Sequence, residues 1–249
     1  KTLVIEKTGR VGGTFHSHRF GGEAGDFWLE LGVHTGYNSY GNFLGLLEDC
    51  HVLANVISRA KVSFRMLLDD RIKSVLSQLD LAELLLSAPH LFTSSKKGQS
   101  IESYYAKIVG RKNFDRVFGP AFSAIICQEA GDFPADMLFQ KRKRRKDILR
   151  QYTFKGGLQT ATDALAAQHN IGIKTGLAAE SISFDGNLFS VATSGGSFES
   201  SCLALASPPA TAAELLKNDF PEVSGLLSGI KTAAVASVGV AIKKEAVNL

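Results

Sequence analysis

The sequence predicts an α/β protein in which a parallel layer is interrupted by a mostly helical segment and followed by antiparallel strands. Three observations support this class. A short apolar run, Leu3 to Glu6, is typical of a buried parallel strand and leads into a glycine pair at 12–13. Apolar residues at helical spacing recur through much of 57–150. After residue 178, Asp-Gly and Gly-Gly pairs separate alternating runs, which indicates hairpins.

The first strand ends in an acid, and the residues after it favour a nucleotide ligand. In dinucleotide-binding folds, a carboxylate at a strand tip binds the ribose hydroxyls of the AMP half. Glu6 occupies such a position. Gly12 and Gly13 would let the backbone approach a bulky ligand, and Arg10 offers a planar fork of donors for phosphate.

The block Glu6-x-x-x-Arg10-x-Gly12-Gly13-Thr14 resembles the second FAD-contacting segment of the flavin amine oxidase and protoporphyrinogen oxidase superfamily. The resemblance implies that Glu6 binds the adenosine ribose, that Arg10 and Thr14 face the ribityl-pyrophosphate region, and that the two glycines pass beneath it.

The same resemblance implies two further segments of a longer flavoprotein. A Gly-rich strand-turn-helix would precede Glu6 by roughly 20 residues, upstream of Lys1, and a C-terminal FAD segment would also lie outside the chain. We therefore expect the isolated 249-residue chain to bind FAD weakly or not at all.

A second segment lies within the later of two predicted strands, 15–20 and 27–35. Its residues, Glu30-Leu31-Gly32-Val33-His34, resemble the second flavin segment of the same superfamily. The resemblance implies that Gly32 gives the backbone room beside the isoalloxazine ring, with Val33 and His34 next to it. His34 is the candidate catalytic residue, as a proton carrier, because imidazole titrates near neutral pH. The simpler interpretation is a histidine that packs or hydrogen-bonds beside the ring.

The middle of the chain predicts mainly helices. A helix over 42–52 precedes an alternating stretch at 62–66, and a long helix over 72–92 is ended or kinked by Pro89. Further helices are predicted over 101–109, with Ser100 as N-cap and Gly110 as terminator, and over 114–127, interrupted at Gly119-Pro120. This block is typical of a separate, substrate-facing domain.

The α/β pattern returns at Tyr152 to Gln159, which resembles the superfamily's Phe-x-Gly-Gly-[Leu/Met]-Gln segment near the flavin. The resemblance implies that Ala179, where the family usually has Val, lends backbone bonds to the adenine, and that Ala206 and Pro208 cover the adenosine side. The predicted elements that follow the Gln159 segment are a helix over 160–167, strands over 172–174, 178–184, 188–193, from 198 onward, 202–206 and 232–242, and a helix over 210–216.

These elements and the resemblance together predict a Rossmann-like FAD-binding domain with a β-meander, interrupted by a mostly helical α+β substrate domain. We expect the FAD-binding domain to comprise residues 1–56 and 151–211. We expect the substrate domain to comprise residues 57–150 and 212–249.

Charge and composition exclude several other functions. The net charge of +4 comes from one run, 141–146, which holds six of the 28 basic residues. A global nucleic-acid-binding field is therefore not expected. The run is typical of a solvated face, with contact to an anionic membrane or to acidic substrate groups as alternatives.

Cysteine and histidine usage indicates neither disulfides nor a metal site. The three cysteines are far apart and read as free thiols of a reducing compartment. His16 and His18 share a strand face, but no third ligand has a fitting spacing. The longest apolar stretch, 232–242, is shorter than the about 20 residues of a membrane span. We expect a cytoplasmic protein, peripherally membrane-associated if 141–146 contacts lipid.

The expected function is FAD-dependent hydride abstraction from a C–H bond of a small, hydrophobic substrate. The superfamily members most similar in pattern are the protoporphyrinogen oxidase-like proteins. Members like UDP-galactopyranose mutase and like the squalene or carotenoid desaturases are alternatives. A non-catalytic module that keeps the fold and docks to a partner or membrane is an alternative of another class. The sequence does not indicate the oligomeric state.

Overall fold

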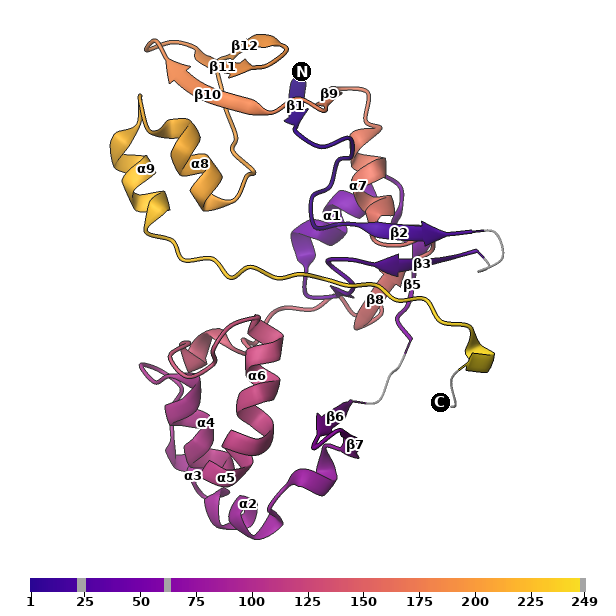
Figure 1. Ribbon diagram of the computed structural model, residues 1–249, viewed down its shortest axis with the longest axis vertical. Helices are drawn as coiled ribbons and strands as arrows, with labels where there is room; N and C mark the ends of the chain where they lie inside the picture. Colours follow the sequence, from indigo (N-terminus) through magenta and orange to yellow (C-terminus); the bar gives the residue numbers. More distant parts are fainter. Residues whose placement is uncertain (22–25, 61–63, 247–249) are drawn as a thin grey trace. The chain divides into compact units, whose positions relative to one another are not determined.

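The computed structural model describes residues 1–21, 26–60 and 64–246, and these form two compact units. The first unit contains Lys1–Arg59 and Arg144–Leu249, and the second contains Ala60–Lys143 (Figure 1). The second unit lies within the predicted block 57–150. Residues 212–249 group with the first unit, and their assignment to a substrate domain stays a prediction.

A parallel strand pair opens the first unit. Strand β1 (Thr2–Glu6) pairs in parallel with β9 (Ile171–Thr175), which follows helix α7 (Gln159–Ala166). The parallel direction predicted for the first strand is therefore confirmed. Its predicted burial is wrong at Leu3 and Val4, which are 45% and 37% exposed. In the described part of the chain β1 pairs with β9 alone, so the strand is incompletely covered.

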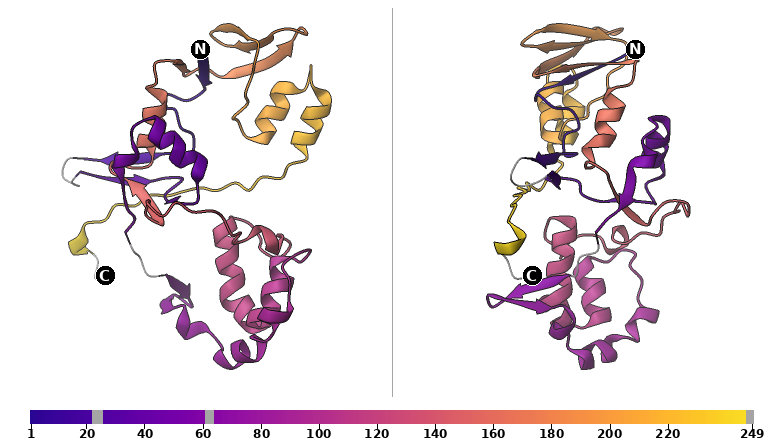
Figure 2. Two further views of the ribbon diagram at one scale, coloured as in Figure 1. Left: turned by 180° about the vertical axis from the view of Figure 1, so that it is seen from behind. Right: turned by 90° about the vertical axis from the view of Figure 1, so that its right-hand side faces the viewer.

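Three antiparallel strands follow, paired in chain order: β10 (Ala179–Phe184), β11 (Phe189–Thr193) and β12 (Gly196–Ser200). Positive φ angles at Gly186 (96°) and Gly196 (117°) form the turns that Asp-Gly and Gly-Gly predicted. Helices α8 (Pro209–Leu216) and α9 (Pro221–Ser228) lie along this sheet (Figure 2), and α9 was not predicted. Their shared core contains Ile182, Val191, Leu215 and Leu216, with Ile5 of β1 packed against it.

Two small sheets bring distant segments of the first unit together. Strand β2 (Ser17–Phe20) pairs with β3 (Phe27–Glu30), so the strands predicted over 15–20 and 27–35 form as a shorter hairpin. Strands β4 (Gly36–Tyr37) and β5 (Val56–Ser58) both pair with β8 (Gln151–Phe154). Helix α1 (Gly41–Asp49) and the 3-10 turn η2 (Leu53–Asn55) cover this sheet. The buried residues there are Leu44, Leu47, Tyr152, Phe154, Leu158 and Ala161.

The second unit is mainly helical, as predicted. Its elements are β6 (Arg65–Leu68), β7 (Arg71–Ser74), η3 (Leu76–Gln78), α2 (Leu81–Ser87), α3 (His90–Thr93), α4 (Ile101–Val109), α5 (Arg111–Asn113), the π-helical turn η4 (Phe114–Phe118), α6 (Gly119–Ile126) and η5 (Ala135–Met137). Ser100 caps α4 by accepting the Ser103 amide at 3.1 Å, and Gly110 ends it at φ +89°, as predicted.

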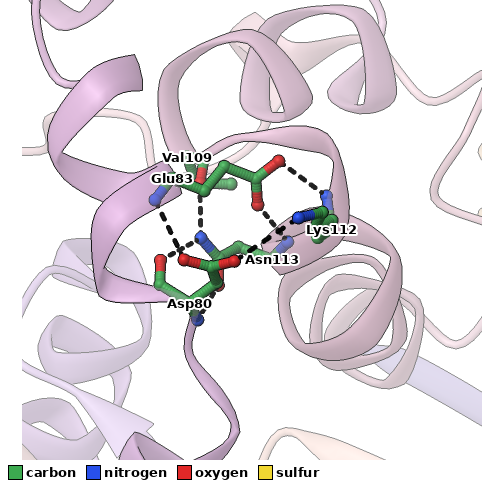
Figure 3. Close-up of polar contacts among 5 residues, drawn as sticks. All are labelled: Asp80, Glu83, Val109, Lys112 and Asn113. Atoms are coloured by element: carbon green, nitrogen blue, oxygen red, sulfur yellow. Dashed lines mark hydrogen bonds and ion pairs between the residues drawn. The ribbon is translucent and has the colours of Figure 1, made fainter.

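A buried amide fastens α2 to the junction of α4 and α5 (Figure 3). Asn113 is 1% exposed, and its Nδ2 donates to the carbonyl oxygens of Asp80 and Val109, each at 2.9 Å. Its Oδ1 accepts the Asp80 amide at 2.8 Å. The Glu83 carboxylate accepts the backbone amides of Lys112 and Asn113. Every polar atom of the Asn113 side chain therefore has a backbone partner.

The structure corrects the predicted helix over 72–92. Residues 72–74 belong to β7, which forms a hairpin with β6. Asp69 and Asp70 both have positive φ angles, 54° and 56°, and make the connecting turn. Asp tolerates this conformation better than most residues. The predicted break at Pro89 is confirmed, because it separates α2 from α3.

Two strands predicted in the last 50 residues are absent. Residues 202–206 and 232–242 are irregular, and apolar side chains such as Leu205 and Val238 are exposed. A strand requires the backbone groups of a neighbour. In the described part of the chain no neighbouring strand pairs with either segment. Residues 22–25 and 61–63 lie outside the described residues, and so does the part of the predicted alternating stretch 62–66 that falls in 62–63.

Candidate functional site

The loop after β1 and the segment after β3 lie side by side. The Thr14 carbonyl accepts the Val33 amide at 3.0 Å, and the His16 carbonyl accepts the Leu31 amide at 2.8 Å. A Cβ atom on Gly32 would lie 2.1 Å from the Thr14 carbonyl oxygen, so only glycine permits this approach. The structure thus brings together the predicted site residues Thr14, Gly32 and Val33. His34 follows with an exposed side chain, its Nδ1 3.3 Å from the Gly32 carbonyl oxygen.

The third predicted segment is joined to these two by Glu30. One carboxylate oxygen of Glu30 accepts the Leu158 amide at 2.9 Å, and the other accepts the Ser17 hydroxyl at 2.7 Å. The same hydroxyl accepts the Gln159 amide at 3.1 Å. A Cβ on Gly157, at φ +95°, would lie 2.3 Å from Ser17 Oγ. The segments around 14, 32 and 157 are therefore held in one arrangement.

Sequence reasoning quoted Glu30 without assigning it a role, and it missed Ser17. The signal was present, since an acid within the apolar run Phe27 to Val33 must find donors if the strand is partly covered. Nothing in the sequence identified the donors, because one of them is 128 residues away.

Glu6 stands at the end of β1, as predicted, with one carboxylate oxygen already paired. Its Oε1 accepts both the hydroxyl and the amide of Thr8, each at 2.7 Å. These hydrogen bonds lower the pKa of Glu6, and the bond from the Thr8 side chain has the largest effect. Glu6 is therefore an anion with a fixed orientation, and within the described residues its Oε2 has no protein donor. Thr8, which orients this carboxylate, was not singled out from the sequence.

The Arg10 guanidinium folds back onto its own loop. Its Nη1 donates to the carbonyl oxygens of Val11 (3.0 Å) and Phe15 (2.9 Å), and its Nη2 donates to that of Gly13 (2.6 Å). Gly12 and Gly13 have φ angles of +100° and +53°. Gly12 also approaches α7, because a Cβ there would lie 2.6 Å from the Thr162 hydroxyl oxygen.

The backbone amides of this loop are candidates for binding an anion. Within the part of the chain that the structure describes, the N–H groups of residues 11–14 donate to no protein acceptor, while the Phe15 amide closes a turn onto the Gly12 carbonyl at 2.9 Å. Successive amides in a loop with left-handed residues commonly bind phosphate. The Glu6 carboxylate and these amides are suited to a ligand that carries both hydroxyl and phosphate groups.

The adenosine-side predictions fall into two groups. The Leu177 amide donates to the Glu6 carbonyl at the end of β1 at 3.0 Å, and Ala179 follows two residues later in the chain. Ala206 and Pro208 lie in the irregular segment before α8, where the Pro208 carbonyl accepts the Ala212 amide at 3.0 Å. Among the described residues, no hydrogen bond links Ala206 or Pro208 to β1.

Within residues 1–21, 26–60 and 64–246, no group of three or more His, Cys, Asp or Glu side chains is placed to hold a metal ion. Over the same residues, no helix combines the length and the apolar character needed to cross a bilayer.

Comparison with known proteins decides the family. The family model for flavin-containing amine oxidoreductases matches residues 1–247. The chain belongs to this family. The resemblance inferred from the three segments is thereby confirmed, and the family supports the expected FAD cofactor. No curated protein matches the chain.

Solved structures share the fold. An oxidoreductase from Methanosarcina mazei is 15% identical, with a TM-score of 0.65 over 92% of this chain and 60% of its own. A candidate protoporphyrinogen oxidase from Exiguobacterium sp. 255-15 is 14% identical, with a TM-score of 0.64 over 89% of this chain and 57% of its own. A putrescine oxidase is 14% identical, with a TM-score of 0.58 over 85% of this chain and 54% of its own. The chain thus spans under two thirds of each neighbour's length.

Proposed function

We propose that the protein is an FAD-dependent oxidoreductase that removes a hydride from a C–H bond of a hydrophobic organic substrate. The observation that carries the proposal is the loop after β1. There the oriented Glu6 carboxylate is followed by four amides, those of residues 11–14, that donate to no protein acceptor among the described residues. That arrangement fits the ribose and pyrophosphate of a dinucleotide. Membership of the flavin-containing amine oxidoreductase family supports the choice of FAD.

Each part of the site has a role in this proposal. Bound FAD would accept the hydride and pass its electrons on. Glu6 would bind the adenosine ribose, and the amides of residues 11–14 would bind the pyrophosphate. Gly32, packed on the Thr14 carbonyl, would bring the backbone beside the flavin ring. Glu30 would keep the three segments in place.

The same proposal assigns each part of the fold to a domain. We assign β1 and β9 to a Rossmann-like sheet and β10 to β12 to its β-meander. Residues 57–150 and 212–249 are assigned to the substrate domain. Ala179, Ala206 and Pro208 are assigned to the adenosine side, of which Ala179 already lies near β1.

Within the family, we propose that the reaction resembles that of protoporphyrinogen oxidase-like proteins. Reactions like those of UDP-galactopyranose mutase and of the squalene or carotenoid desaturases are the alternatives. His34 is exposed and within reach of the Gly32 carbonyl oxygen, which fits a hydrogen-bonding role as well as proton transfer. Substrate identity depends on pocket walls that vary on a common fold.

The basic run 141–146 supports a peripheral contact with anionic lipid. It is irregular rather than helical, and its first four side chains are exposed. Arg145 differs from the others, because it forms ion pairs with Glu48 and Asp147. Exposed Lys and Arg each add roughly 1 kcal/mol of attraction at an anionic membrane. We propose no nucleic-acid partner.

The following experiments test these proposals on the product of the full gene. The visible absorption spectrum of the purified protein, with release of its chromophore, should show FAD. Anaerobic bleaching by porphyrinogens, polyenes or amines would then identify the chemistry. A colourless protein that does not bind added FAD but sediments with phosphatidylserine vesicles would favour the alternative of a non-catalytic module that docks to a membrane. Replacing residues 141–144 by Gln should abolish sedimentation if that run binds lipid.

A further inference from the structure

We infer that Arg10 is a positioning residue that shapes the phosphate-facing loop, and that it does not itself bind phosphate. The inference rests on the proposed function, because it concerns how this loop receives FAD. It replaces the expectation that the Arg10 fork points at the ligand. The structure shows the fork occupied by the protein's own backbone.

The bonding pattern of Arg10 requires a planar, branched donor. Its two terminal nitrogens reach the carbonyl oxygens of residues 11, 13 and 15 at 2.6–3.0 Å. Three acceptors at alternating positions along one loop surround a single guanidinium. A lysine ammonium carries the same charge but is a single point on a flexible stem, so it cannot span the same three acceptors.

This pattern sets the direction of the loop amides. In a trans peptide, the carbonyl of one residue and the N–H of the next point in opposite directions, and the described chain has no cis peptide bond. The Val11 and Gly13 carbonyls point toward Arg10. The N–H groups of Gly12 and Thr14 therefore point away from it, and neither donates to a protein acceptor among the described residues.

The loop after β1 also contacts the segment that contains Gly32 and Val33. The Gly12 carbonyl accepts the Phe15 amide, and the Thr14 carbonyl accepts the Val33 amide. Gly32 packs directly on the same Thr14 carbonyl. Without Arg10, the backbone of this loop would be less firmly held around residues 11–15. Its hydrogen bond to Val33 and its packing on Gly32 would weaken as a result.

The test compares Arg10→Lys and Arg10→Gln with the wild-type protein, all produced from the full gene, with Lys7→Gln as a control. Lys7 is an exposed cation three residues away. FAD affinity is measured by titration, and amide hydrogen exchange is measured without FAD. We expect both Arg10 variants to bind FAD roughly tenfold or more weakly, with Arg10→Lys no better than Arg10→Gln. We expect faster exchange at the Phe15 and Val33 amides in both variants and not in Lys7→Gln.

Several outcomes would overturn the inference. If Arg10→Lys restores wild-type affinity, the charge acts directly on phosphate. Unchanged exchange at Phe15 and Val33 in the variants would show that Arg10 does not shape the loop. If neither variant folds, hydrogen exchange in the wild-type protein still tests the inference. A preformed loop must protect the Phe15 amide from exchange before FAD is added. Absence of FAD binding by the wild-type protein contradicts the proposed function instead, while the exchange data still test the loop.

Discussion

Glu30 and Leu158 are 128 residues apart in sequence, and the Glu30 carboxylate accepts the Leu158 amide at 2.9 Å. This bond joins the end of β3 to the start of α7. The second oxygen of the same carboxylate holds Ser17, which in turn accepts the Gln159 amide. Glu30, which had no role assigned from the sequence, therefore connects the second and third of the segments that resembled flavin-contacting motifs. The first segment is joined to the second by the hydrogen bond from the Val33 amide to the Thr14 carbonyl.

Replacing Glu30 by Ala should destabilise the protein by about 2–3 kcal/mol, because it leaves the Leu158 amide and the Ser17 hydroxyl without their acceptor. Denaturant unfolding measures the change. Glu180→Ala is the matched control, since its side chain is exposed, and should cost less than about 0.5 kcal/mol. Equal effects in the two variants would show that Glu30 does not connect the segments.

Replacing Gly32 by Ala should separate the loop at Thr14 from the segment after β3. The added Cβ would lie 2.1 Å from a backbone oxygen that cannot rotate away. We expect a loss of about 1–3 kcal/mol of stability together with weaker FAD binding. Gly45→Ala in α1 is the control, because nothing lies within 4 Å of its added Cβ. It should stabilise by roughly 0.5–1 kcal/mol, and similar losses in both variants would contradict this account.

Replacing Thr8 by Ala should shift the pH dependence of FAD binding. Hydrogen bonds from Thr8 lower the pKa of Glu6. The contribution of ionised Glu6 is therefore complete above the ordinary carboxyl pKa of about 4.3 and is lost as pH falls through the lowered pKa. In Thr8→Ala the pKa rises, so FAD affinity should begin to fall at a higher pH than in the wild type.

Thr8→Ser is the control for that titration, because it keeps the hydroxyl. FAD dissociation constants measured between neutral pH and the onset of acid unfolding give the midpoints. Thr8→Ser should follow the wild-type curve. Superimposable curves for all three proteins would mean that Thr8 does not set the charge of Glu6, or that Glu6 does not contact the ligand.

Replacing Asn113 by Leu should destabilise the helical unit by about 2–3 kcal/mol. The substitution removes one acceptor and two donor bonds of a buried amide, and it leaves the Asp80 amide and two carbonyl groups unpaired. Thermal unfolding followed by far-UV circular dichroism measures the loss. Asn218→Leu, at an exposed position, should change little. A stable Asn113→Leu protein would show that packing alone fastens α2 to α4.

The sequence predicted best where local chemistry decides structure. Turns at Gly186 and Gly196, the Ser100 cap and the Pro89 break were all found from neighbours within a few residues. The hairpin at Asp69-Asp70 was missed because the apolar spacing from Ile72 onward also fits a helix. Short apolar runs do not separate these two possibilities.

Features that depend on distant partners were the least predictable. The run 202–206 has a strand-like composition, yet no described segment pairs with it. Arg10 lies in the loop after β1, but its backbone partners could not be predicted from residue types. The same holds for Thr8 and Ser17, because Thr and Ser hydroxyls in such positions are more often bound to nearby backbone or water.

The most direct test of the account compares FAD with FMN as ligands of the wild-type and Glu6→Ala proteins from the full gene. FMN lacks the adenosine ribose that Glu6 is proposed to bind. We predict that the wild type prefers FAD, and that Glu6→Ala weakens FAD by roughly 10- to 100-fold while leaving FMN affinity unchanged. Equal affinity of the wild type for both ligands, or an unchanged FAD affinity in Glu6→Ala, would contradict the proposed site.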